Sequence, residues 1–203
     1  MSTVFVKTFD APPIDRREIL RYAGVRDGEE GLSELLEECL SEAEGQFCYK
    51  VCYAYYPVSQ CGDAVDLGFA RVRSAHLAKH LADCDCVAVF AATVGLPIDR
   101  LIAKYGSISP VRSLLFQALG TERIEALCDA FCKELAHDRA KDGFWTRPRF
   151  SAGYGDIPLA LQKDIFSVLD CPRKIGLALS PSLFMSPSKS VTALVGIAKE
   201  TGK

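Results

Sequence analysis

Residues 84–93 form an almost wholly apolar run in which only Asp85 and Thr93 carry clearly polar side chains. The run is rich in β-branched and aromatic residues, and it is far too short to cross a bilayer as a helix. A segment of this kind is typical of a central strand that is buried on both faces. The sequence therefore predicts a sheet with this strand inside it.

The remaining periodicities predict helices and strands in an irregular order. Helices are expected at residues 14–23, 33–44, 74–82, 97–105, 110–136 and 159–169, and further strands at residues 46–58, 65–72, 175–179 and 191–198. Two helices thus precede the first strand, Gly120 kinks or divides the longest helix, and a Ser/Pro-rich loop spans residues 180–190. This order predicts an α+β fold with a mixed or mostly antiparallel sheet and flanking helices, in one domain over residues 1–203.

Composition excludes several classes of function. The formal net charge of −2 and the absence of any Lys/Arg run longer than a pair argue against a nucleic-acid surface. The first 13 residues lack the apolar core of a secretory signal, and no apolar run is long enough to span a membrane. We therefore expect a cytoplasmic protein with neither nucleic acid nor membrane as a partner.

The nine cysteines are odd in number and scattered through predicted core segments, which favours reduced thiols over a disulfide framework. Three pairs lie close in sequence, Cys48 with Cys52, Cys84 with Cys86, and Cys128 with Cys132, yet none has the paired C-x-x-C spacing of a strong zinc signal. Buried small hydrophobic side chains are the favoured interpretation. An iron–sulfur site stays open as an alternative, and no metal is predicted.

The histidines and glycines give no familiar catalytic motif. His76 and His80 are four apart on a predicted helix, but no H-E-x-x-H surrounds them, and His137 stands alone. Neither a G-x-G-x-x-G fingerprint nor a P-loop occurs, and no glycine-flanked nucleophile is present. Hydrolase, kinase and dinucleotide-binding functions are therefore disfavoured.

Residues 149–156 form an Arg- and Gly-rich segment, RFSAGYGD, that carries the main candidate site. Arg149 can grip a carboxylate with two parallel hydrogen bonds. Ala152 and Gly153 leave room for a ligand against the main chain, and Tyr154 adds an aromatic hydroxyl. The segment indicates a site for a small molecule with a carboxylate, although an exposed arginine beside an ordinary glycine turn would look similar.

Further segments accompany R-x-x-x-G-Y, which runs from Arg149 to Tyr154: a helix ending in FSVL at residues 166–169, IGLAL at residues 175–179, MSPSKSV at residues 185–191 and, more weakly, FAATVG at residues 90–95. In this order the segments resemble the activation (AdoMet-binding) domain of cobalamin-dependent methionine synthase. The resemblance covers residues 84–196. It implies that Arg149, Ala152, Gly153 and Tyr154 bind S-adenosylmethionine (AdoMet), with Asp10 or Asp15 as candidates for the ligand's amino group.

The resemblance also implies a function: reductive reactivation of a cobalamin-dependent methyltransferase, in which cob(II)alamin is reduced to cob(I)alamin and AdoMet supplies the methyl group. The chain lacks the homocysteine, folate and cobalamin modules and any D-x-H-x-x-G signature, so cobalamin must come from a partner. That partner is methionine synthase in the favoured interpretation, with a flavodoxin-like or other electron donor. Two alternatives stay open: another corrinoid protein as the client, or an interaction protein that has kept only the fold.

Overall fold

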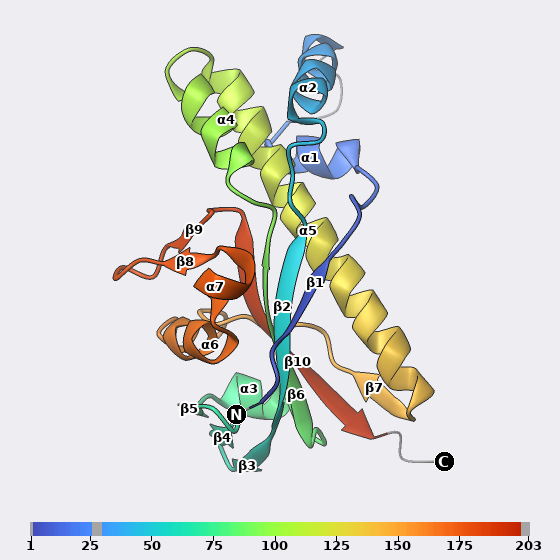
Figure 1. Cartoon of the computed structure of the whole chain (residues 1–203), viewed down its shortest axis with the longest axis vertical. Coiled ribbons are helices and arrows are strands. Elements are labelled where there is room, and N and C mark those ends of the chain that lie inside the picture. Colours follow the sequence, from blue (N-terminus) through green and yellow to red (C-terminus); the bar gives the residue numbers. More distant parts are fainter. Residues whose placement is uncertain (1, 26–29, 200–203) are drawn as a thin grey trace.

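The structure is a computed structural model that describes residues 2–25 and 30–199. At its centre is a five-stranded sheet whose neighbouring strands are all antiparallel (Figure 1). The strand order is β1 (Phe5–Thr8), β2 (Lys50–Pro57), β6 (Cys86–Thr93), β10 (Ser190–Lys199) and β7 (Phe144–Thr146). The apolar run is the middle strand and is buried from Val87 to Thr93, which confirms the prediction for it.

Helices cover both faces of this sheet. Helix α5 (Pro110–Lys141) packs on one face, while α3 (Ala75–His80), α6 (Leu161–Leu169) and α7 (Cys171–Ile175) pack on the other (Figure 1). Because side chains of a strand alternate between faces, β6 serves two cores. Phe90 packs with α5, whereas Val89 packs with α6 and α7. The predicted α+β class with a mostly antiparallel sheet is confirmed.

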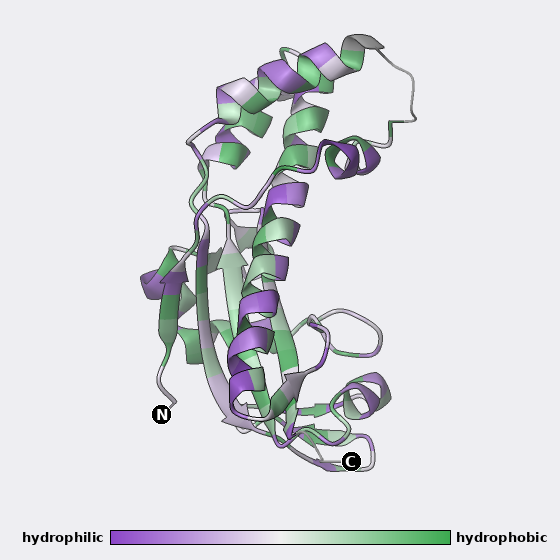
Figure 2. Ribbon diagram, turned by 90° about the vertical axis from the view of Figure 1, so that its right-hand side faces the viewer, coloured by the Kyte–Doolittle hydropathy of each residue, from purple (hydrophilic) through white to green (hydrophobic). Residues whose placement is uncertain are grey.

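Helix α5 runs past the end of the sheet, and its first half supports a group of helices there (Figures 1 and 2). These are α1 (Arg16–Tyr22), α2 (Glu30–Ala43) and α4 (Pro97–Gly106). Gly120 does not divide α5, contrary to one of the predicted outcomes. A Cβ atom at Gly120 would lie 2.9 Å from Ile98 Cγ1, so this glycine allows α4 to approach α5 closely. The polar stretch after residue 136 continues the helix to Lys141.

Five short strands were not predicted correctly. Strand β1 precedes both N-terminal helices, so the expectation of two helices before the first strand is wrong. Residues 65–72 are not one strand but the turn region of a small sheet formed by β3 (Ser59–Cys61), β4 (Ala64–Asp66) and β5 (Arg71–Arg73). Strand β7 was not predicted at all. Segments of three or four residues are too short to show an alternation, and pairing with neighbouring strands fixes them.

The segment after α6 also differs from prediction. Residues 171–175 form α7, which Pro172 opens at its first turn, and Gly176 ends it with a φ of +70°. Only Ala178–Leu179 of the predicted strand is extended, as β8, and it pairs with β9 (Met185–Ser186) inside the predicted loop. Among the described residues, no helix is both long and apolar enough to cross a membrane.

Candidate functional site

The RFSAGYGD segment is anchored to the edge of the central sheet. Phe150 and Leu194 of β10 exchange two backbone hydrogen bonds of 2.8 Å each. The chain then turns: the N–H of Tyr154 donates to the carbonyl of Ser151 at 3.2 Å, and that of Gly153 donates to the carbonyl of Ile157 at 3.1 Å. Gly153 has a φ of +84°, a conformation that favours glycine. The backbone of the candidate site is therefore held in one shape.

Arg149 points toward α5 and is already engaged there. Its Nη2 donates to Glu125 Oε2 at 2.6 Å and to Asp129 Oδ1 at 3.0 Å, and only 24% of its side chain is exposed. Burial opposes its charge, but Cys128, Glu125 and Asp129 outweigh that effect and leave the pKa of Arg149 raised. Arg149 is a permanent cation between two carboxylates.

Those two carboxylates line an acidic cavity of about 420 Å³ between α5 and the segment that leads into α1. Its charged lining consists of Asp15, Glu18, Glu122, Glu125, Asp129 and the single base Lys133. Asp15 is one of the two candidates for the ligand's amino group, and its carboxylate accepts hydrogen bonds from the N–H groups of Arg17 and Glu18 to cap α1. Asp10, the other candidate, does not line this cavity.

The other predicted site residues lie elsewhere. Ala152 is buried in the core on the α6 side of the sheet. Tyr154 is 71% exposed, and its ring stands edge-on to Phe150 at 5.6 Å, in a groove beside α3. The structure thus places Arg149 and Tyr154 against different elements and does not gather the predicted residues in one pocket. Their role in ligand binding stays a prediction.

Glu125 and Asp129 were not identified from the sequence. They are four apart on a helix, which is ordinary spacing for a polar face, and nothing local links them to Arg149. Arg149 reaches these two carboxylates because the next residue, Phe150, pairs with Leu194 of β10. Their relation to the site could not be read from spacing alone.

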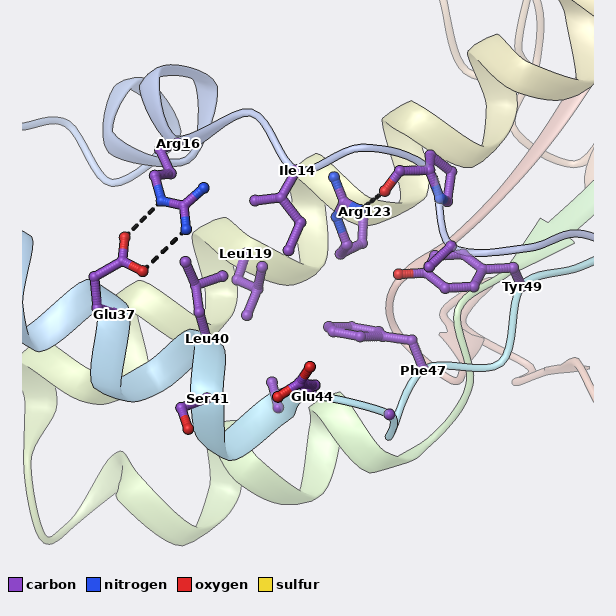
Figure 3. A pocket seen from close by; sticks show the side chains of 14 residues that line it. Ile14, Arg16, Glu37, Leu40, Ser41, Glu44, Phe47, Tyr49, Leu119 and Arg123 are labelled. Atoms are coloured by element: carbon purple, nitrogen blue, oxygen red, sulfur yellow. Dashed lines mark hydrogen bonds and ion pairs between the residues drawn. The ribbon is translucent and has the colours of Figure 1, made fainter.

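A further cavity of about 430 Å³ lies between α1, α2 and the start of β2 (Figure 3). Phe47, Tyr49 and Leu119 line it, and the ion pair of Arg16 with Glu37 stands at one side. None of the residues predicted for AdoMet binding lines it. The structure gives this cavity no part in the candidate site.

All nine cysteines are free thiols. Burial raises the pKa of Cys132 to about 11, and it raises the pKa of the neighbouring Cys128 as well, so both stay protonated near neutral pH. Among the described residues, no group of three or more His, Cys, Asp or Glu side chains is placed to hold a metal ion.

Comparison with known proteins finds a likeness in structure but none in sequence. No family model matches the chain, and no curated protein matches its sequence. The structure, however, matches the crystal structure of the MetH reactivation domain bound to AdoHcy with a TM-score of 0.68, over 99% of this chain and 80% of the other. The chain has the fold of the MetH reactivation domain. The predicted α+β fold, with a mostly antiparallel sheet and flanking helices, is thereby confirmed, while the 14% sequence identity limits the likeness to the fold.

Proposed function

We propose that this protein binds AdoMet through Arg149 and supports the reductive methylation of cobalamin carried by a partner, in the first place methionine synthase. The proposal is supported by the match of nearly the whole chain to a reactivation domain whose structure holds AdoHcy, the demethylated form of AdoMet. The ordered sequence segments around R-x-x-x-G-Y lend independent support.

The charges around Arg149 suit this ligand. Arg149, Glu125 and Asp129 together carry one more negative than positive charge. AdoMet carries a carboxylate, an ammonium group and a sulfonium, and so one more positive than negative charge. Its carboxylate can replace one partner of Arg149, and its ammonium or sulfonium can then face the carboxylate that is released. Binding by this exchange leaves no charge of the site unpaired, and it assigns Glu125 and Asp129 the acidic role.

The protein's contribution to the reaction is positioning. AdoMet supplies the methyl group, and an electron donor supplies the electron that converts cob(II)alamin into the nucleophilic cob(I)alamin acceptor. Holding the sulfonium in line with the acceptor on a partner makes the transfer effectively unimolecular. Such a reaction needs no general acid or base, which fits a site made of an arginine, two carboxylates and a fixed loop.

Two alternatives differ from this proposal in testable ways. A different corrinoid methyltransferase protein as client would keep AdoMet binding and change only the partner. An interaction protein that has kept the fold alone would bind no AdoMet.

Reactivation of methionine synthase in its cob(II)alamin form tests the proposal. With a reductant and AdoMet, we expect the wild-type protein to accelerate formation of methylcobalamin, measured by absorption, and Arg149→Ala to abolish that acceleration. Arg173→Ala, at an exposed position on α7, is the matched control and should behave as wild type. No acceleration of any corrinoid protein by the wild type would overturn the proposal.

A further inference from the structure

A groove lies beside the 147–155 segment, on the side away from the Arg149 side chain and the acidic cavity. It has a volume of about 460 Å³ and separates α3 from that segment; its lining residues are His76, Lys79, His80, Arg147, Phe150, Tyr154 and Gly155. This volume falls within the range of small-molecule sites, about 300–1,000 Å³.

The two cavities lie on different sides of the 147–155 segment, as the contacts of two neighbouring residues show. Arg149 contacts α5, while Phe150 packs with the core on the α3 and α6 side. A ligand in the groove therefore contacts a different surface from one held by Arg149.

Aromatic rings form one wall of the groove. The ring of Phe150 lies 4.8 Å from the ring of His80, whose Nε2 is 2.7 Å from the carbonyl oxygen of Pro148 and fixes the imidazole in place. Tyr154 stands edge-on to Phe150 and leaves most of its own ring exposed. The exposed ring of Tyr154, with the half-buried ring of Phe150 beside it, offers a stacking surface for a planar heterocycle.

The charged groups of the groove are all bases. Lys79 and Arg147 line it together with the two imidazoles, and among the described residues no carboxylate does. The neighbouring Asp156 is taken up by the start of α3, where it accepts from the hydroxyl of Ser74 and from the N–H of Ala75 at 2.8 Å. Asp156 also lies 3.6 Å from His76 Nδ1, and Arg147 donates to the carbonyl of Ala82 at 2.8 Å and lies 4.0 Å from the exposed carboxylate of Asp83. Lys79 forms no ion pair with any described residue, so its charge is left for an anion from outside.

The backbone is shaped to keep the groove in this form. Gly155 has a φ of +60°, and a Cβ atom there would lie 2.6 Å from Nδ1 of His76. Only glycine lets the loop pass so close to the imidazole. The groove is a built feature rather than a chance gap between side chains.

We propose that this groove is a second binding site, for a planar aromatic heterocycle that bears a phosphate, as in a nucleoside monophosphate. The heterocycle stacks on Phe150 and Tyr154, and the phosphate pairs with Lys79 and Arg147. This ligand is anionic, opposite in charge to the one expected at Arg149. The proposal stands apart from AdoMet binding.

Calorimetric titration of the full chain with AMP, adenosine and inorganic phosphate tests this site. We expect AMP to bind at least about tenfold more tightly than either of its parts, because base and phosphate contact the groove together. Lys79→Glu should weaken AMP binding about tenfold by replacing attraction with repulsion. Lys174→Glu, a charge reversal at an exposed position on α7, is the control and should change nothing.

Three results would overturn the second site: AMP that binds no more tightly than adenosine, affinity that Lys79→Glu leaves unchanged, or displacement of AMP by AdoMet. Arg149→Ala should retain AMP binding in full. A wild-type protein that binds AMP but not AdoMet would count against the proposed function alone, and a wild-type protein that binds AdoMet but not AMP would count against this site alone.

Discussion

Arg123, on α5, is the largest side chain that is fully buried among the described residues. It holds the N-terminal segment against α5 through hydrogen bonds. Its Nη1 donates to the carbonyl of Pro12 at 2.5 Å and its Nη2 to that of Pro13 at 2.8 Å, and it forms an ion pair with Glu122. Glu122 in turn accepts from the N–H of Asp15 at 3.1 Å. This network fixes the edge of the acidic cavity.

Removing Arg123 should destabilise the protein strongly. Arg123→Met leaves the Glu122 carboxylate buried without its partner, which costs about 3–5 kcal/mol. The double variant Glu122→Gln/Arg123→Met removes the orphaned charge and should recover part of that loss. Urea denaturation measures both free energies of unfolding. A loss below about 1 kcal/mol for Arg123→Met would show that the network contributes little.

Because Glu125 and Asp129 are negatively charged, we expect the cavity to prefer the sulfonium of AdoMet over the neutral sulfur of AdoHcy. Glu125→Gln removes one negative charge from the cavity, so we expect it to weaken AdoMet binding about three- to tenfold and to weaken binding of uncharged-sulfur AdoHcy less. Competition titrations of both ligands against wild type and variant measure the difference. Equal losses for the two ligands would mean that the carboxylate does not face the sulfonium.

At the scale of elements, the contact of α4 with α5 depends on Gly120. The Cβ of Gly120→Ala would lie 2.8 Å from Lys189 Cγ and 2.9 Å from Ile98 Cγ1, and Ile98 is buried, so we expect a loss of about 1–3 kcal/mol. Gly106→Ala is the matched control, because nothing lies within 4 Å of its added Cβ. Alanine there should be neutral or stabilise α4 by up to about 1 kcal/mol. Thermal unfolding of both variants checks the contrast; a stabilised Gly120→Ala would refute it.

The long periodic elements were predictable and the short ones were not. Helix α5 and strand β6 carry enough apolar positions to show their period, and both were found. Strands β1 and β7 have four and three residues, and their pairing partners lie far away in sequence. Helix α7 was missed because IGLAL, which looks like a strand, starts at its last residue.

For the candidate site, the sequence supplied the loop but not its surroundings. Arg149 to Tyr154 could be chosen from residue chemistry and from the resemblance. The pairing of Arg149 with Glu125 and Asp129 depends on how α5 packs over β10, and no local pattern encodes that. The opposite orientation of Arg149 and Phe150 likewise follows from the backbone bonds to Leu194.

At the scale of the whole molecule, one sheet joins two cores. Phe90 and Val89 are neighbours on β6 and belong to different cores, so loss of either core should disrupt the strand that supports the other. We expect Phe90→Ala to cost about 3–5 kcal/mol and to leave a single unfolding transition. Far-UV circular dichroism and the fluorescence of Trp145, the single tryptophan, should report coincident midpoints. Separate midpoints would mean that the two cores unfold independently.

The acidic cavity is also a property of the whole chain, because its lining comes from the segment before α1, from α1 and from α5, and Arg149 from the loop after β7 pairs with two of its carboxylates. We propose that Arg149 holds AdoMet there. Calorimetric titration of the wild type and Arg149→Ala with AdoMet tests this most directly. We predict one molecule bound by the wild type and an affinity at least about tenfold lower in the variant. Unchanged binding by Arg149→Ala, or none by the wild type, would contradict the account.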